Sequence, residues 1–337
     1  MSDEASGPTK ARCYLSPFDI KSQKYLFNFR RNLTACDMEV KSASDVWKLK
    51  SIFHFGPKRY LFLNWLEDRV LSQRSKPRWL NLPVFLYRLL IAKAQRIDIV
   101  WVRHNYRPHT TVVPEWVCGF VYWLMGAISS RVVVHSQSYA EANGYHYLPH
   151  PLYEPCVEKP SADFIEQVKG IETRIAVIGQ VRPSKQFEQM LEEWPREIPL
   201  FVSGKPSSDE YGRTLMEIAR RRDLNASFIL RQIETSEFDY ILRAVKAIYI
   251  ANPDNTMIVS GVYFHAASLG TPMIMRASKF ADEMASRCRF TVQVLTADEI
   301  ANAINELRPL TRNDIICEAE TLFGLGAFKQ HFSQLNL

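Results

Sequence analysis

The second half of the chain alternates short apolar runs with longer segments of helical character, and this alternation restricts the fold more than any other feature. The apolar runs are IAVIG (175–179), PLFVSG (199–204), SFIL (227–230), AIYIA (247–251), TPMIM (271–275) and TVQVL (291–295). Strands separated by helix-length segments indicate a parallel sheet with crossover helices. We therefore predict a doubly wound α/β domain over residues 164–315.

The first half shows a similar pattern with weaker periodicity. Helices are predicted over Trp79–Ala94 and Glu115–Ile128, and strands over Ala11–Leu15, Met38–Lys41, Arg59–Trp65, Ile97–Arg103 and Arg131–His135. Residues 1–150 are therefore predicted to form another Rossmann-like domain. A length of 337 residues suits two domains of ordinary size.

A proline-rich segment separates the two halves. Pro149, Pro151, Pro155 and Pro160 exclude a continuous helix or a central strand, so residues 151–163 are predicted to be an interdomain linker. Residues 316–337 are predicted to form a C-terminal helix that packs back on the first domain. Two Rossmann-like domains joined in this way would face each other across a cleft, and open α/β sheets bind ligands at the carboxyl ends of their strands.

The charge is distributed unevenly between the halves. Residues 1–150 hold 21 Lys and Arg against 11 Asp and Glu, a net charge of +10, whereas residues 151–337 hold 21 against 25, a net charge of −4. A basic first half favours an anionic membrane surface or a polyanion as its partner. The alternative is a scattered, solvated basic surface.

Several other classes of protein are excluded by motif and composition. The six cysteines are dispersed without metal-site spacing, so neither a disulfide framework nor a structural metal is predicted. No GxGxxG follows a strand and no Walker motif occurs. The polar segment Met1–Lys10 is not a signal peptide, and the longest apolar run, the 14 residues Trp116–Ser129, is too short to span a bilayer. These features predict a cytoplasmic protein.

Two segments of the second half are predicted to bind phosphate. Gly179 ends a strand and is followed by Arg182 and Lys185 before a predicted helix start, where amides and cations favour an anion. Downstream, Ser260 and Gly261 offer a hydroxyl and an unshielded amide at the start of a later helix, predicted from about Ser260 to Leu269. The alternatives are solvated cations in the first segment and simple helix capping in the second, by Asn255 or Ser260.

Acidic and imidazole side chains follow two strands of the first half. Glu67 and Asp68 come after the strand YLFLNW, where a general base would be placed. His104, Asn105 and His109 come after the strand DIVWV and include groups that bind anions or transfer protons. The alternative for Glu67 is a surface salt bridge with Arg69 or Arg103.

These motifs together resemble a known family, the GT-B glycosyltransferases of bacterial exopolysaccharide and capsule assembly, and among them the β-mannosyltransferase of xanthan synthesis. Asn64-Trp65-Leu66-Glu67 is similar to the family's HWPE-like motif, and His104–His109 matches its HNxxPH motif. GQVRPSK (179–185) resembles the GxxRPYKG-like turn. Val259-Ser260-Gly261 resembles the NSG element, and LGTPMI (269–274) the LxxGxPVI strand. Asn64 departs from the family by replacing a histidine, so no imidazole role is expected at that position.

The resemblance implies a fold and a reaction. The fold is GT-B, and the reaction moves a sugar from a nucleotide-sugar donor, GDP-mannose being favoured, with inversion and without a cofactor or metal. Arg182, Lys185, Ser260 and Gly261 would hold the diphosphate. Glu67 is the first choice of base, Asp68 the second, and His104 a donor to sugar or phosphate. Asn64, Trp65, Asn105 and His109 would line the acceptor side.

The resemblance and the basic first half together predict a lipid-linked saccharide acceptor in surface polysaccharide synthesis. Basic residues flank an apolar aromatic segment over Lys76–Arg96, which favours peripheral attachment to the anionic inner leaflet of the inner membrane, although the same segment also fits a core helix. Two rival functions remain: a sugar-nucleotide epimerase of the same architecture, and a non-enzymatic basic membrane-surface binding protein. No nucleic-acid-binding signature occurs.

Overall fold

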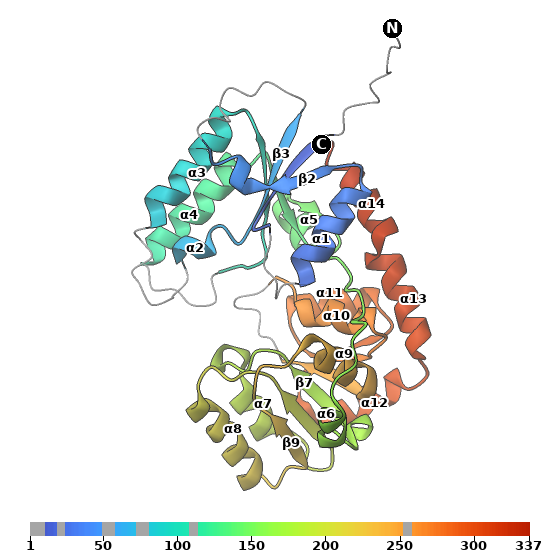
Figure 1. Ribbon diagram of the computed structural model, residues 1–337. Coiled ribbons are helices and arrows are strands. Elements are labelled where there is room, and N and C mark those ends of the chain that lie inside the picture. Colours follow the sequence, from blue (N-terminus) through green and yellow to red (C-terminus); the bar gives the residue numbers. More distant parts are fainter. Residues whose placement is uncertain (1–10, 19–23, 49–57, 72–80, 108–113, 252–257) are drawn as a thin grey trace. The chain divides into compact units, whose positions relative to one another are not determined.

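The computed structural model describes residues 11–18, 24–48, 58–71, 81–107, 114–251 and 258–337. The chain divides into two compact units (Figure 1). Unit 1 comprises Met1–Pro151 together with Leu325–Leu337, and unit 2 comprises Leu152–Gly324. None of the described helices is long and apolar enough to cross a membrane.

Unit 1 is built on a parallel sheet of six strands in the order β2-β1-β3-β4-β5-β6. The strands are β1 (Arg12–Ser16), β2 (Glu39–Ser42), β3 (Arg59–Asn64), β4 (Asp98–Val102), β5 (Arg131–Val134) and β6 (His146–Tyr147). The helices are α1 (Lys24–Ala35), α2 (Asp68–Leu71), α3 (Leu82–Ala94), α4 (Glu115–Ile128), α5 (Gln137–Asn143) and α14 (Leu325–Ser333). Burial on both faces explains why β4 is apolar throughout after Asp98, from Ile99 to Val102.

Unit 2 is built on a second parallel sheet of six strands, in the order β12-β11-β10-β7-β8-β9. The strands are β7 (Ile175–Ile178), β8 (Leu200–Ser203), β9 (Ala226–Ile229), β10 (Ala247–Ile250), β11 (Met273–Arg276) and β12 (Thr291–Val294). The helices are α6 (Ala162–Gln167), α7 (Phe187–Glu193), α8 (Asp209–Arg221), α9 (Thr235–Ala244), α10 (Gly261–Ser268), α11 (Lys279–Arg287), α12 (Ile300–Leu307) and α13 (Arg312–Phe323). Numbered from β7, this is the 3-2-1-4-5-6 order of a Rossmann sheet, which bears out the predicted doubly wound domain.

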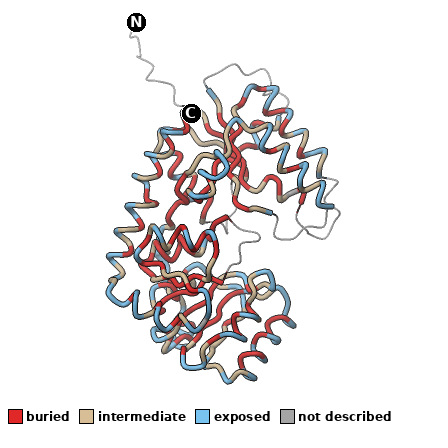
Figure 2. Tube along the Cα trace, turned by 180° about the vertical axis from the view of Figure 1, so that it is seen from behind, coloured by how far each residue is buried: buried red, intermediate tan, exposed pale blue. Residues whose placement is uncertain are grey.

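The cores of both units lie between the strands and the inward faces of the helices. Figure 2 shows buried segments gathered inside each unit, whereas segments on the outside alternate between buried and exposed positions. Helix α8 illustrates the cause: Tyr211, Leu215 and Ile218 recur at helical spacing on its buried face and join the core of unit 2.

The boundaries between the units differ from the predicted ones at two places. The segment after Pro151 belongs to unit 2, where the backbone N–H of Tyr153 donates to Ser268 Oγ (2.8 Å) and that of Cys156 to Asp239 Oδ2 (2.6 Å). The C-terminal segment forms two helices instead of one, because α13 ends at Phe323 and α14 begins at Leu325. A side chain at the intervening Gly324 would overlap the Glu320 carbonyl oxygen at 2.4 Å.

Candidate functional site

The strand order of unit 2 reverses between β7 and β10. These two strands pair directly, with Ile175 opposite Ala247 and Ala176 opposite Ile248. In one direction the sheet continues to β8 and β9, and in the other to β11 and β12. Ligands of open α/β sheets bind at the carboxyl ends of the strands at such a switch point, and Gly179 and Ser260 follow these two strands.

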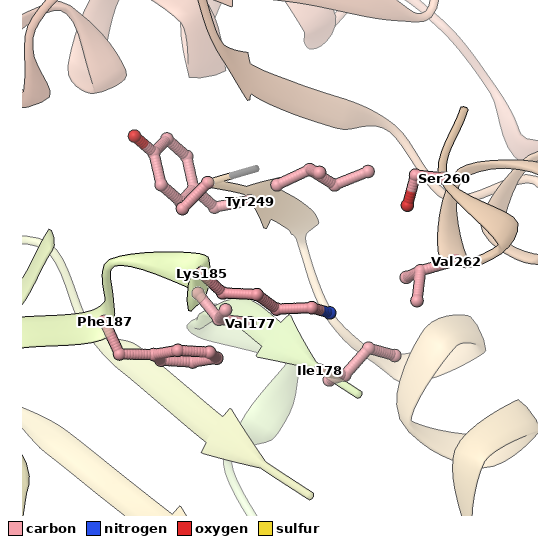
Figure 3. Close-up of a pocket in the computed structure, with 9 residues that line it drawn as sticks. Val177, Ile178, Lys185, Phe187, Tyr249, Ser260 and Val262 are labelled. Atoms are coloured by element: carbon pink, nitrogen blue, oxygen red, sulfur yellow. The ribbon is translucent and has the colours of Figure 1, made fainter. Parts of the chain in front are cut away.

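A small pocket lies at this switch point (Figure 3). Its wall is largely apolar, Lys185 supplies its charged group, and Ser260 and Tyr249 are the lining residues that carry a hydroxyl. The lining residues are Val177, Ile178, Lys185, Phe187, Tyr249, Ile250, Ala251, Ser260 and Val262. The two predicted phosphate-binding segments therefore contribute to one pocket, although they are distant in the sequence.

Lys185 extends from the β7–α7 connection into this pocket, and Figure 3 shows its ammonium group pointing toward the side lined by Ser260 and Val262. Burial, and secondarily the charge of Arg182, lowers the pKa of Lys185 to about 8. Within the part of the chain that the structure describes, no carboxylate lies within ion-pair distance of its Nζ. A desolvated cation without a counter-charge is unfavourable until an anion binds beside it.

Two glycines bring the ends of β7 and β8 into close contact. Gly179 has a φ of 120° and Gly204 a φ of 141°, which side-chain-bearing residues rarely adopt. A Cβ on Gly204 would lie 1.6 Å from the Gly179 carbonyl oxygen, and one on Gly179 would lie 3.6 Å from Lys185 Nζ. The sequence analysis identified Gly179 but missed Gly204, although PLFVSG ends in glycine just as IAVIG does.

The connection after β7 differs from the prediction in one respect. A helix was expected to start beside Arg182 and Lys185, but Pro183–Lys185 form a 3-10 turn and α7 begins at Phe187. The left-handed backbone of Gln186 (φ 55°) separates the turn from α7. Arg182 is partly buried and does not line the pocket, but its charge acts on Lys185.

Ser260 occupies the N-cap position of α10 with extended backbone dihedrals, yet its side chain makes no capping hydrogen bond. The residue is buried and lines the pocket, so its hydroxyl faces the ligand space instead of its own helix. Gly261 follows as the first residue of α10, and a Cβ there would lie 3.3 Å from the Tyr153 hydroxyl. Asn255, the other predicted capping residue, lies outside the described residues.

Unit 1 gathers its predicted acceptor-side residues at the carboxyl ends of β3 and β4. His104 Nε2 donates to Asn64 Oδ1 (2.9 Å), and the His104 ring stacks on Trp65 with centroids 4.3 Å apart. Burial, reinforced by His135 and His150, holds the pKa of His104 well below its ordinary value, so the ring is neutral at pH 7. Asn105 is buried beside it, and His109 lies outside the described residues.

The sequence analysis missed three further members of this ring cluster: Tyr25, His135 and His150. Tyr25 of α1 contacts the rings of Trp65, His104, His135 and His150 at centroid distances of 4.9 to 5.6 Å. His135 Nδ1 donates to the Leu148 carbonyl oxygen (2.7 Å), so its Nε2 accepts from the Tyr25 hydroxyl (2.8 Å). No group of described residues here or elsewhere has the arrangement of a metal site.

Glu67 is the first choice of base from the sequence, with a surface salt bridge as the alternative, but its side chain does not lie at the surface. Its side chain is fully buried, and neither carboxyl oxygen has a hydrogen-bond partner among the described residues. Burial, together with the charge of Asp68, raises its pKa to about 8, so it is mostly protonated at neutral pH. Asp68 begins α2 and is partly exposed.

Comparison with known proteins places the fold among the GT-B structures. No family model and no curated protein sequence matches the chain. HepE (Alr3699) of Anabaena in complex with UDP aligns with a TM-score of 0.62 at 13% identity, covering 97% of this chain and 99% of HepE. HepE structures with UDP and glucose and with UDP-glucose align similarly.

Two further structures support the same fold. AviGT4, a glycosyltransferase involved in avilamycin A biosynthesis, aligns with a TM-score of 0.58 at 14% identity over 96% of each chain. Sucrose-phosphate synthase from Thermosynechococcus elongatus aligns with a TM-score of 0.57 at 14% identity, covering 97% of this chain and 98% of the synthase. The predicted GT-B fold, with one Rossmann-like sheet in each unit, is confirmed.

Proposed function

We propose that this chain is a glycosyltransferase that binds a nucleoside-diphosphate sugar at the β7–β10 switch point of unit 2. The observation that carries the proposal is Lys185, whose ammonium is desolvated beside Ser260 in a pocket where no described carboxylate neutralises it. A diphosphate supplies the missing negative charge. The GT-B fold and the HepE structures with UDP and UDP-glucose support this choice of ligand.

The same groups account for catalysis of glycosyl transfer. As the bond from the sugar to the diphosphate breaks, negative charge accumulates on the leaving oxygen. Lys185, the nearby charge of Arg182 and the amides at the start of α10 stabilise that charge more strongly in the transition state than in the bound donor. In this proposal two side-chain cations take the role of a metal ion, and no cofactor takes part.

The donor proposal rests on two different arguments. The motif resemblance favours GDP-mannose, whereas the HepE complexes favour UDP-glucose, so these two donors are tested first. For the acceptor we propose a lipid-linked saccharide of surface polysaccharide synthesis. Unit 1 would attach peripherally to the cytoplasmic face of the inner membrane that holds this acceptor. The net charge of +10 over residues 1–150 supports this partner.

An inverting reaction needs a base for the acceptor hydroxyl. Glu67 is protonated at neutral pH and closed off from solvent, so it is a poor base in this arrangement. We therefore propose Asp68, the second choice from sequence, as the base. Incubation with donor alone separates this proposal from the rival epimerase, because an epimerase turns over without an acceptor.

The donor site is tested by calorimetry with UDP and GDP on wild-type protein, Lys185→Ala and Lys205→Ala, the last an exposed lysine of the same unit. Lys185→Ala loses a buried charge-assisted contact, so we expect it to bind the nucleotide roughly 10- to 100-fold more weakly. Lys205→Ala should bind with the affinity of the wild type. Affinity of the wild type is also expected to fall above pH 8, where free Lys185 loses its proton, and this dependence should vanish in Lys185→Ala. Absence of binding heat with every nucleoside diphosphate would remove the proposal.

A further inference from the structure

Helix α4 exposes a continuous apolar face. Trp116 is 74% exposed and Trp123 is 66% exposed, and Phe120 between them is exposed as well. These residues recur at spacings of four and three, so they lie on one side of the helix. Val121 and Met125 face the opposite way into the core of unit 1, which fixes the orientation of the helix.

Helix α3 adds a second apolar face beside the first. Leu90 is 65% exposed, and Tyr87, one turn before it, is exposed on the same side, while Phe85 and Leu89 are buried in the core that also holds Val121 and Met125. Both helices contact β4, and Figure 1 shows them side by side on the sheet. We call the outward side of the two helices the α3–α4 face.

Among the described residues of the two helices, only basic charge remains after one ion pair is formed. Glu115 is the only acidic residue of the two helices, and Arg107 pairs with it at 3.3 Å. The exposed Lys93 lies on α3, and the exposed Arg96 follows its C-terminal end. The α3–α4 face is therefore an apolar, tryptophan-bearing surface with a basic margin.

We propose that the α3–α4 face is the surface by which the protein lies on an anionic lipid bilayer, with Trp116 and Trp123 inserted at the headgroup level. Tryptophan favours that level because its ring is apolar while its N–H bonds to water or headgroups. Helices of 13 and 14 residues are too short to span a bilayer, so they lie in the plane of the interface. This inference rests on the proposed membrane attachment and supplies its surface.

The structure also changes where the lipid contact falls. The sequence analysis placed it on Lys76–Arg96, of which residues 76–80 lie outside the described part. Within α3, Phe85 and Leu89 are core residues and are unavailable to lipid. Among the residues that the structure describes, the largest exposed aromatic side chains lie instead on α4, which the sequence analysis judged only by its length.

The proposal is tested by flotation with liposomes of phosphatidylcholine, with and without 30% phosphatidylglycerol. Trp116→Ala/Trp123→Ala is expected to lower the partition coefficient between vesicles and water at least about tenfold, because the variant lacks the favourable free energy of moving two indole rings out of water. Val157→Ala/Leu295→Ala is the matched control, since Val157 (98% exposed) and Leu295 (69% exposed) are apolar residues of unit 2. Lys93→Gln/Arg96→Gln should weaken binding only to the anionic vesicles.

The outcomes separate this inference from the donor-site proposal. Circular dichroism and UDP or GDP calorimetry should be unchanged in Trp116→Ala/Trp123→Ala, which shows that the variant is folded. The proposal that the α3–α4 face binds the bilayer is overturned if the wild-type protein fails to float, or if the tryptophan variant floats as well as the wild type. A dimer in light scattering that the tryptophan variant converts to a monomer also overturns it, in favour of contact between copies. Flotation without nucleotide binding defeats the donor site alone.

Discussion

Two ionisable side chains, Lys185 and Glu67, show how surroundings separate a binding group from a core group. Burial favours the neutral form of both groups, so it lowers the pKa of Lys185 to about 8 and raises the pKa of Glu67 to about 8. Lys185 nevertheless lines a pocket, and at pH 7 it stays mostly charged. Glu67 is fully buried, and at pH 7 it is mostly uncharged. The lysine is thus suited to hold an anion, whereas the carboxyl is not suited to accept a proton.

Glu67 is expected to make stability dependent on pH. Its pKa is raised from 4.5 to about 8 in the folded state, so between these values the folded chain holds a proton that the unfolded chain releases. Its contribution is therefore complete below pH 4.5 and is lost at about 1.4 kcal/mol per pH unit up to pH 8. Melting temperatures of wild type and Glu67→Gln should diverge between pH 5 and 8, with wild type falling relative to the variant. Parallel melting curves over that range contradict the burial argument.

The choice of base is tested with the same isosteric change at two neighbouring positions. Glu67→Gln replaces a protonated carboxyl by a neutral amide, so we expect transfer to fall by less than about tenfold at pH 7. Asp68→Asn removes the proposed base and is expected to reduce kcat by roughly 10²- to 10⁴-fold. A large loss in a folded Glu67→Gln protein with normal activity in Asp68→Asn would reverse the assignment. Retention of anomeric configuration in the product would remove the need for a base.

At the scale of elements, the ends of parallel strands build the site. Gly179 follows β7 directly, Gly204 follows β8 directly, and Ser260 is the N-cap of α10, the helix that comes after β10 in the sequence. Because the strands are parallel and adjacent, their carboxyl ends meet at one edge of the sheet. The contact between Gly179 and Gly204 fixes the backbone on which Lys185 is mounted.

Gly204→Ala is expected to cost at least about 3 kcal/mol of unfolding free energy, since it combines a strained φ with overlap on the Gly179 carbonyl. The control is Gly119→Ala in α4, where a Cβ meets nothing within 4 Å. This second change should raise stability by about 0.5–1 kcal/mol, because alanine is the better helix former. Denaturant unfolding measures both, and a Gly204→Ala protein of normal stability would contradict the close approach.

At the scale of the whole molecule, the chain leaves unit 1 at Pro151 and returns to it at Leu325. Helix α14 belongs to the core of unit 1, although it follows all of unit 2 in the sequence. Phe328 contacts Phe29 of α1 with centroids 5.9 Å apart, and Phe332 stacks on Phe62 of β3 at 6.4 Å. The stability of unit 1 therefore depends on the last residues of the sequence.

Phe328→Ala is expected to destabilise unit 1 by about 3–5 kcal/mol, because Phe328 is fully buried. Phe27→Ala, which removes an exposed phenylalanine of α1, should cost less than about 1 kcal/mol. Scanning calorimetry measures both changes. Below the melting transition, UDP or GDP binding should be the same in both variants, because the pocket lies in unit 2. Loss of nucleotide binding in folded Phe328→Ala would show that the units are not independent in this respect.

Periodicity determined the secondary structure well because strands buried on both faces must be apolar throughout and because crossover helices must separate parallel strands. The runs IAVIG, PLFVSG and AIYIA therefore identified β7, β8 and β10 before any contact was known. Glycine and cation motifs likewise directed attention to Gly179 and Lys185, which lie in the connection after β7, with Lys185 lining the pocket. Each of these signals is local, so the sequence alone contains it.

Only the tertiary structure decided which groups face a pocket and which face a core. Glu67 and Asp68 are neighbours with the same charge in the sequence, yet packing buries the first completely and leaves the second partly exposed. Tyr25, His135 and His150 join His104 from distant segments, and Trp116 and Trp123 are exposed although their run is apolar. Burial and proximity depend on contacts between residues far apart in the chain, and those contacts exist only after the sheets have formed.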